Sequence, residues 1–547
     1  MSEEMKVEHK QVIKGTFWGL AGMFASKFLT FVYTILIARM FSQSDIGAFN
    51  LALSIASIIL VFSDFGLSST FARYIPYYLG KKEEKKVGEL LNVSFIWAGA
   101  FSLILSILLL LFAGNIAEFY KNEGLVTPIK FMAIYIIGGT FLGFVFNILN
   151  SYQKIKESNL VNSIQIVLKL ILTIGLYYLG SSGQVSISFG FTVAYILTLG
   201  ISLFLIKSQI KEAFGTKNFD IKKQIEMLKE IVPFGIMLTL TTLFWSVATN
   251  VDRIMLGYLL PTAEASAKIA IYTMAISFAS LIAAFSGIVI VIMLPVLSSM
   301  HGGGKIHEAH GISKSAGRWL IFLVAPFVII MTAIPHEILS LFYGSAYASG
   351  GIVLSIFAVG MFIRSLSLVH GAMLASLRIV KIELYAALLA VLLNILLNIV
   401  TIPTYGMEGS AVASLISFFA VSAIIIYYSN KIAKFGWREE FTKPIIAAIA
   451  TCIVLWILHD KIVQIVSINV QINTGIDLVN NISLKVIRLV VFGLLFAGIS
   501  GLYFAILSII KGFEKEDREL LGSMLHRTKV PKNIISLAQQ MMRGIEN

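Results

Sequence analysis

The amino-acid sequence predicts an all-α, multi-pass membrane protein. Of its 547 residues, 57% are hydrophobic and 13% are charged, whereas soluble domains contain roughly 45–50% apolar and about 25% charged residues. Apolar runs long enough to cross a bilayer, such as 93–113 and 384–402, recur along the whole chain. Two of the apolar segments are also similar to each other in sequence, which indicates an internal repeat. These properties exclude a soluble enzyme.

Hydropathy predicts about fourteen membrane-spanning helices. The first apolar run is longer than the core of a signal peptide and has no small-residue cleavage site, so it is expected to stay attached as the first span. The predicted spans occupy residues 14–40, 47–71, 90–113, 128–150, 159–179, 186–206, 231–258, 269–294, 318–334, 351–377, 384–402, 409–429, 443–458 and 485–510.

The basic residues predict the orientation of these spans. Most of the 43 Lys and Arg residues fall in the N-terminal segment, the C-terminal segment and alternate loops between them. Short basic loops are retained in the cytoplasm, so both termini are expected to be cytoplasmic, in the cell membrane of a prokaryote. The net charge of +13 is therefore mostly a topology signal, and no nucleic-acid partner is expected. The single cysteine, Cys452, lies in an apolar run, and the sequence predicts no metal site and no cofactor.

An internal repeat predicts two six-helix lobes. Residues 46–63 align without gaps to residues 269–286, with identical residues at eight positions. These segments are the second and eighth spans, so the offset of six spans predicts a parallel repeat around a central cavity. The expected domains are an N-terminal lobe over 1–206, a cytoplasmic interfacial linker over 207–230, a C-terminal lobe over 231–430, two extra helices over 431–510 and a cytoplasmic tail over 511–547.

Three cations lie in the middle of predicted spans: Lys27, Lys169 and Arg364. A buried charge without a partner is strongly destabilising, and the sequence offers no carboxylate at comparable depth. We therefore expect these cations to bind the anionic head group of a substrate, a phosphate or pyrophosphate. The alternative is that each pairs with a carbonyl, a water or a carboxylate from another span. Charged residues near span ends are candidates for structural or gating roles: Asp64, Arg73, Asp252 and Arg253.

Short motifs occur in a fixed order along both halves of the chain. The first half contains AR at 38–39, G at 47, SDFGL at 63–67 and RY at 73–74; the second half contains NVDRIMLGY at 250–258, PVLS at 295–298, FYG at 342–344 with Tyr347, IP at 402–403 and YGMEGSA at 405–411. Over about residues 10–435, this set resembles the polysaccharide-biosynthesis flippases of the Wzx type. The resemblance implies the multidrug/oligosaccharidyl-lipid/polysaccharide exporter (MOP) fold.

The leading hypothesis is a flippase that moves a lipid-linked oligosaccharide, carried on polyprenyl phosphate or pyrophosphate, from the inner to the outer leaflet by alternating access. A peptidoglycan-precursor flippase and a drug or cation antiporter are alternatives on the same fold, although an antiporter calls for buried carboxylates. A membrane glycosyltransferase needs catalytic carboxylates in an aqueous loop, and the longest outer loop, 459–484, has only Asp460 and Asp477. We expect no enzyme activity and no catalytic residue. Expected partners are the lipid-linked saccharide and membrane lipids, with a coupling ion and glycan-assembly proteins as further candidates.

Overall fold

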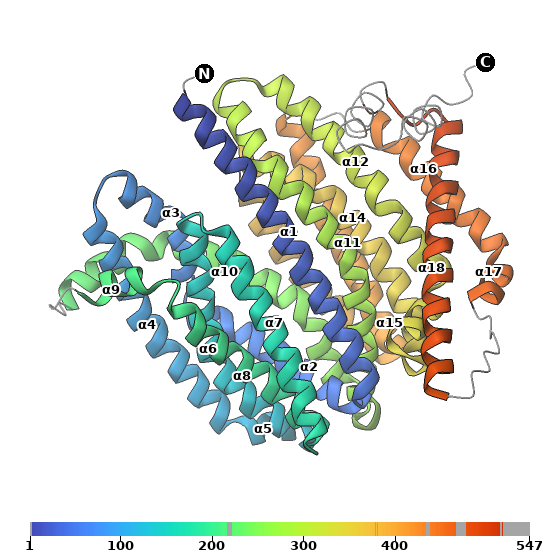
Figure 1. Cartoon of the computed structure of the whole chain (residues 1–547), viewed down its shortest axis with the longest axis horizontal. Coiled ribbons are helices and arrows are strands. Elements are labelled where there is room, and N and C mark those ends of the chain that lie inside the picture. Colours follow the sequence, from blue (N-terminus) through green and yellow to red (C-terminus); the bar gives the residue numbers. More distant parts are fainter. Residues whose placement is uncertain are drawn as a thin grey trace. The chain divides into compact units, whose positions relative to one another are not determined.

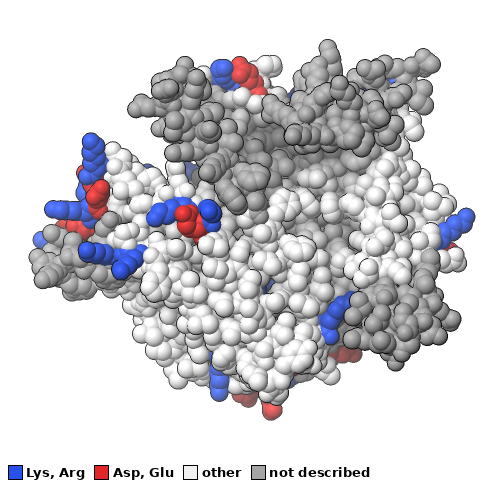
Figure 2. All heavy atoms as spheres, viewed as in Figure 1, with Lys and Arg blue, Asp and Glu red and all other residues white. Residues whose placement is uncertain are grey.

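The structure is a computed structural model that describes residues 3–215, 221–377, 379, 381–433, 438–466, 477–514 and 517. Every regular element in this part of the chain is a helix (Figure 1), which confirms the predicted all-α class. On the face shown in Figure 2, the charged side chains gather in small groups and leave broad expanses without Lys, Arg, Asp or Glu. Such a surface is typical of a protein that spans a membrane several times.

Eleven helices in the described ranges are long and apolar enough to cross a membrane. One of them, α15 (Lys381–Ala433), has 53 residues and a break at Gly406, where φ is 58° and ψ is −133°. At 1.5 Å per residue it measures about 80 Å, more than twice the roughly 30 Å of a hydrocarbon core, so it supplies two spans. Two further spans are pairs of helices bent by 54° and 72°. Counted in this way, the described residues contain fourteen spans, as the sequence predicts.

In the first half, each predicted span forms one helix, except the second. The unbroken ones are α1 (Glu3–Met40), α4 (Glu84–Leu111), α6 (Val126–Ser151), α7 (Ile155–Tyr178) and α8 (Gly183–Leu203). The second span consists of α2 (Gln43–Ser63) and α3 (Leu67–Gly80), which meet at Gly66 with a φ of +70°. Shorter elements of this half are α5 (Ala113–Phe119), η1 (Glu123–Leu125) and α9 (Lys207–Gly215).

The break at Gly66 has two local causes. The Asp64 carboxylate accepts a hydrogen bond from the Gly66 amide at 2.8 Å and another from the Ser68 hydroxyl, so it ties the turn to the start of α3. A Cβ atom at position 66 would lie 2.2 Å from the Thr239 hydroxyl oxygen on α10. Only glycine combines the positive φ with this close approach. Asp64, a candidate for a structural or gating role, thus fixes the turn between α2 and α3.

The second half contains α10 (Ile221–Leu259), α11 (Thr262–Gly302), α12 (Ile306–Ala333), α13 (Pro335–Tyr343), η2 (Ser345–Gly350), α14 (Gly351–Ser376), α15, α16 (Arg438–Ile457), α17 (His459–Val466) and α18 (Asp477–Ile509). The segment predicted as an interfacial linker forms α9 and the start of α10, which bends by 54° beside Pro233. Residues 467–476 of the longest predicted outer loop lie outside the described residues, as do 515–516 and 518–547 of the predicted tail.

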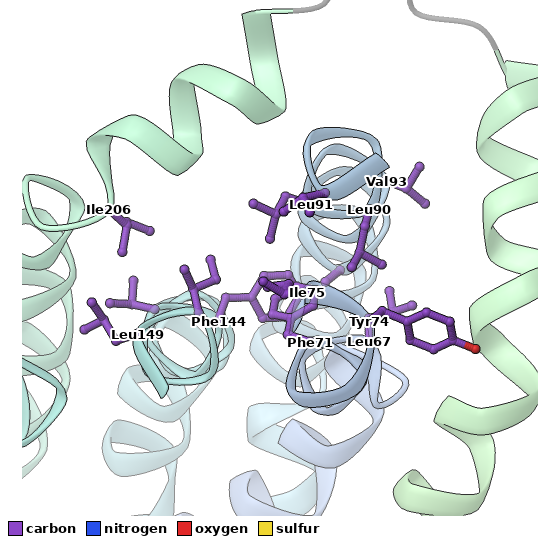
Figure 3. Packing of buried hydrophobic residues seen from close by; sticks show 14 of the residues in the cluster. Leu67, Phe71, Tyr74, Ile75, Leu90, Leu91, Val93, Phe144, Leu149 and Ile206 are labelled. Carbon is purple, nitrogen blue, oxygen red and sulfur yellow. The ribbon is translucent and has the colours of Figure 1, made fainter. Parts of the chain in front are cut away.

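The chain separates into two compact units. Unit 1 comprises Met1–Thr273 and Ala390–Ala413, and unit 2 comprises Met274–Leu389 and Ser414–Asn547. The hydrophobic core of unit 1 forms where α3, α4 and α6 meet, and Figure 3 shows Phe71 and Ile75 of α3 between Leu90 of α4 and Phe144 of α6. All four side chains are fully buried. This core fixes α3 against its neighbours.

Equivalent contacts within the two units support the internal repeat. Ser63, at the end of α2, hydrogen-bonds Thr140 of α6 at 2.5 Å, and the aligned Ser286 of α11 hydrogen-bonds Ser365 of α14 at 2.6 Å. Each half also inserts a short α-helix and a 3₁₀ turn at the matching place, α5 with η1 and α13 with η2. Because both the bonds and the inserted elements recur six spans apart, the two halves share one architecture. The lobe boundaries at 206 and 231 stay a prediction.

Candidate functional site

The three predicted mid-span cations lie in different surroundings. Lys27 of α1 is exposed, next to Phe24 and Phe28, which are 50% and 66% exposed. Lys169 of α7 is buried, whereas Arg364 of α14, in unit 2, is half-buried. Hydrocarbon cannot solvate an exposed ammonium group, so Lys27 must meet water or an anionic ligand. Of the three, Lys27 is the one most open to a ligand.

Lys169 points into unit 1. Its ammonium nitrogen lies 4.0 Å from the centre of the Tyr33 ring on α1 and 5.6 Å from the centre of the Phe191 ring on α8. Ring faces attract cations, most strongly where water is excluded. In this conformation, Lys169 is therefore enclosed between three helices and is not accessible to a large head group.

Arg364 has local contacts within unit 2. Its Nη1 donates to the Ser367 hydroxyl at 2.9 Å, and that hydroxyl donates in turn to the Arg364 carbonyl oxygen at 2.8 Å. Glu383, near the start of α15, interacts electrostatically with the guanidinium group. This interaction was not predicted from the sequence, and it leaves open the alternative that Arg364 pairs with a carboxylate from another span. A guanidinium group has five donors, and its planar fork suits a phosphate.

Asp252 lies at the centre of a buried polar cluster in unit 1. Its carboxylate accepts from the Tyr272 hydroxyl of α11 at 2.6 Å and from Asn398 Nδ2 of α15 at 2.8 Å. Asn398 Nδ2 is also 2.9 Å from Asn394 Oδ1, and the Ser410 hydroxyl donates to the Tyr272 oxygen at 3.3 Å. The cluster joins α10 and α11 to both arms of α15. These partners were not predicted from the sequence. The spacing of Asn394 and Asn398, i and i+4 in an apolar span, does place two polar side chains on one face of a membrane helix and could have indicated a buried polar contact.

Arg253 follows Asp252 on α10 but points to other partners. Its Nε donates to Thr273 at 3.2 Å, and its Nη1 donates to Asn250 at 3.1 Å and to Ser54 of α2 at 3.5 Å. Both of these adjacent charges thus hydrogen-bond to neutral groups of α11, but Asp252 also binds α15, whereas Arg253 also binds α2. Arg253 connects α10 to α2, which suits the gating role considered for it.

Helix α10 packs along α2 and α3 over their whole length, and we call this contact the α10 seam. At one end, Leu51 of α2 contacts Gly257, and Gly47 lies against the start of α11, where a Cβ atom would be 1.7 Å from the Ser266 carbonyl oxygen. Midway, the Ser246 hydroxyl donates to the Ser57 carbonyl oxygen at 3.2 Å. Close contact at the Gly47 end thus depends on glycine.

The opposite end of the α10 seam is held by tyrosines. The Tyr78 hydroxyl donates to Glu230 Oε1 at 2.7 Å, and the Tyr74 hydroxyl donates to the Glu230 carbonyl oxygen at 3.2 Å. Arg73, a predicted gating candidate, is exposed beside them with its guanidinium carbon 5.5 Å from the centre of the Tyr74 ring. Both ends of the seam therefore carry contacts that could break and re-form independently of each other.

The chain is similar to known membrane proteins along most of its length. The family described as polysaccharide biosynthesis protein matches residues 12–301, more than half of the chain, and the MatE family matches residues 238–400. An uncharacterized membrane protein of Methanocaldococcus jannaschii, MJ1068, is 22% identical over 528 residues, which cover 93% of this chain and 98% of that protein. The probable low-salt glycan biosynthesis flippase Agl15 of Haloferax volcanii is 21% identical over 402 residues, which cover 73% and 79%.

A solved structure shows the same fold. The lipid II flippase MurJ, in an inward closed conformation, superposes with a TM-score of 0.65 at 17% sequence identity, covering 88% of this chain and 98% of that one. A multidrug resistance MATE family transporter of the MOP superfamily, in an inward-facing conformation, has the same fold with a TM-score of 0.58 at 15% identity, covering 77% of this chain and 98% of that one. This fold, together with the match over residues 12–301, shows that the chain belongs to the polysaccharide biosynthesis protein family.

Proposed function

We propose that this protein translocates a lipid-linked oligosaccharide, on a polyprenyl phosphate or pyrophosphate carrier, from the inner to the outer leaflet of a prokaryotic cell membrane, with both termini in the cytoplasm. The family description and the glycan flippase among its relatives support this substrate class. The observation that carries the proposal is that Lys27, which lies in the middle of the predicted first span 14–40, is exposed. A cation at the centre of a membrane helix costs about 3 kcal/mol unless it is solvated or paired.

Lys27 and Arg364 are the residues we assign to the head group. A phosphate would supply a negative charge beside the exposed Lys27 ammonium group, and it can accept two parallel hydrogen bonds from a guanidinium group. Arg364 presents the five donors of a guanidinium group, and one of its nitrogens, Nη1, donates to Ser367. Lys169 reaches a head group only if α1 moves away from α7. The lipid tail would remain in the bilayer throughout the cycle.

The α10 seam supplies the gates for alternating access. With cytoplasmic termini, the Gly47 end faces outward and the Glu230 end faces inward. A head group can pass only one end at a time, so the Arg253–Ser54 contact and the Tyr78–Glu230 contact must open alternately. The 3.5 Å bond from Arg253 is at the limit of a hydrogen bond, so this bond itself contributes little to keeping the outer end closed.

The alternative functions differ in the charge they require. A peptidoglycan-precursor flippase also needs cations for a pyrophosphate, so the site does not distinguish it from a glycan flippase. A drug or cation antiporter needs a carboxylate that a cationic substrate can reach. Asp252 is 3% exposed, and its two carboxylate oxygens already accept hydrogen bonds from Tyr272 and Asn398. The geometry therefore favours an anionic substrate. A coupling ion and glycan-assembly proteins stay predictions.

Deletion of the gene is expected to leave the lipid-linked glycan on the cytoplasmic face of the membrane. The lipid-linked pool would be isolated from inverted and right-side-out vesicles and probed with an impermeant glycosidase. Wild-type protein should restore access from outside, whereas Lys27→Ala should not, because the head group loses its counter-charge. If deletion leaves the distribution of the lipid-linked glycan between the two membrane faces unchanged and makes the cells sensitive to drugs, the protein is an antiporter and not a flippase.

The Gly47→Val substitution is expected to hold the outer end of the α10 seam open. The new side chain would overlap the Ser266 carbonyl group. A Leu51→Cys reporter in a Cys452→Ser background, which contains no other cysteine, should then react faster with an impermeant maleimide added outside, by at least about tenfold. Gly143→Ala is the matched control, because no atom lies within 4 Å of the added Cβ. Equal labelling of the Gly47→Val and control proteins would show that this contact is no gate.

A further inference from the structure

Around Lys169, buried hydrogen-bond donors outnumber the acceptors that the described residues offer them. Gln165, Lys169 and Thr173 follow one another at intervals of four residues on α7, and their side chains are 5%, 8% and 1% exposed. This spacing places all three on one face of the helix. The same face meets Tyr33 of α1, whose hydroxyl lies beside Thr173.

The polar atoms of this face lack ordinary hydrogen-bond partners. Within the part of the chain that the structure describes, none is found for Gln165 Nε2, and the Tyr33 and Thr173 hydroxyls have no partner except each other. The Lys169 ammonium group lies over the Tyr33 and Phe191 rings. The Lys169 ammonium group and the NH2 group of Gln165 can only donate, and both hydroxyls can donate. A buried group of this composition lacks an acceptor with negative charge.

The neighbouring helices cannot supply that acceptor as a carboxylate. The sequence contains no Asp or Glu from residue 9 to residue 44, which includes α1 after Glu8, and none from residue 158 to residue 203, which includes the rest of α7 and all of α8. Helix α6, which also packs on α8, contains none either, and the one acidic residue of α2, Asp45, lies in the first turn of that helix and accepts a hydrogen bond from Ser42. An ion from solution is the remaining source of negative charge.

We propose that Lys169, Gln165, Thr173 and Tyr33 form a binding site for one small inorganic anion, of the size and charge of chloride. Close helix packing limits the size of the ligand. A Cβ atom at Gly190 of α8 would lie 2.3 Å from the Thr173 hydroxyl oxygen and 2.7 Å from its amide nitrogen. Across the same interface, Ser26 of α1 and Ser163 of α7 are joined by a 3.3 Å hydrogen bond. A sugar phosphate does not fit between helices packed this closely.

The bound anion would join α1 to α7 and α8 by neutralising Lys169. This site is distinct from the substrate site assigned to Lys27 and Arg364, and it does not depend on the proposed function. Any protein of this sequence that folds as described should show it, whatever substrate it carries.

Halide-dependent stability of the purified full-length protein tests the site. Thermal unfolding would be followed in sodium gluconate as chloride or bromide replaces gluconate at constant ionic strength. We expect a saturable rise in Tm of roughly 2 °C for the wild-type protein. Lys169→Met should abolish the rise, and Lys130→Met, which removes an exposed lysine of α6 in the same unit, should leave it unchanged. Replacing gluconate with inorganic phosphate should not raise the Tm.

Each other outcome overturns the proposal. A wild-type Tm that does not respond to halide, or a Lys169→Met protein that responds as the wild type does, would show that the lysine is held by its aromatic neighbours alone. Stabilisation by phosphate but not by halide would contradict the size of the site. If Lys169→Met does not fold, Gln165→Leu serves instead, and it should raise the half-saturating bromide concentration by about tenfold. An unchanged half-saturating concentration in that variant would equally refute the site.

Discussion

Replacing Arg364 with methionine is expected to lower the initial rate of lipid-linked oligosaccharide translocation by about 100-fold, because the head group loses charge-assisted hydrogen bonds worth about 1.5–3 kcal/mol. The rate would be measured in proteoliposomes as the loss of a fluorescent saccharide lipid from the inner leaflet. Methionine keeps the length and the apolar stem of the side chain, so α14 should still pack. Arg364→Lys keeps the charge but loses the planar fork, and it should retain an intermediate rate.

Lys431→Met is the control for this prediction. Lys431 is exposed at the end of α15, in the same unit as Arg364, and takes no part in the assigned site. Its replacement should leave the rate unchanged. A wild-type rate in the Arg364→Met protein, with equal amounts of inserted protein, would mean that Arg364 serves only its local contacts with Ser367 and Glu383.

Arg318→Ala is expected to destabilise the protein by about 3–5 kcal/mol. Arg318 of α12 is 2% exposed, and its Nε and Nη2 donate to Asp517 Oδ1 at 3.1 and 3.0 Å. Its Nη1 forms an ion pair with Glu514 at 2.6 Å. Asp517 is completely buried, so removing the guanidinium group leaves a buried carboxylate without its cation. The half-life of the detergent-solubilised protein at elevated temperature, and its Tm, would measure the loss.

Two comparisons separate the buried charge from general damage. Lys305 and Glu308 form an exposed ion pair, 3.5 Å apart, at the start of α12. Such a pair should contribute no more than about 0.5 kcal/mol to the free energy of unfolding, so Lys305→Ala should hardly change the stability. The double substitution Arg318→Met with Asp517→Leu removes both buried charges and should recover most of the lost stability. A double variant as unstable as Arg318→Ala would show that packing, and not the unpaired charge, causes the loss.

The helices were predictable because membrane solvation leaves few alternatives. A backbone in hydrocarbon must satisfy its own hydrogen bonds, so each long apolar run becomes a helix. The break at Gly66 was not predicted, although the residues that cause it are adjacent in the sequence. Its cause includes the distant Thr239, which occupies the space that a side chain at position 66 would need. Local hydropathy carries no information about such a contact.

The candidate site was predictable only in part. Their positions in the middle of predicted spans mark Lys27, Lys169 and Arg364 as unusual. These positions do not show which way each side chain points. Lys27 and Lys169 are both central in their predicted spans, yet Lys27 is exposed and Lys169 is buried. Only the packing of the helices accounts for this difference. The partners of Asp252 come from α11 and α15, more than a hundred residues away in the case of Asn398. Contacts of this kind depend on tertiary structure, so they cannot be predicted from the hydropathy of individual spans.

The central claim is that the protein recognises the charged head group of a lipid-linked saccharide, and one comparison tests it most directly. Proteoliposomes would receive the same fluorescent oligosaccharide on polyprenyl pyrophosphate or on an uncharged polyprenyl glycoside. Recognition of the head group predicts that only the pyrophosphate form is translocated rapidly and that Lys27→Met protein loses this rapid translocation. Equal rates for the charged and uncharged lipids, unaffected by Lys27→Met, would contradict the account.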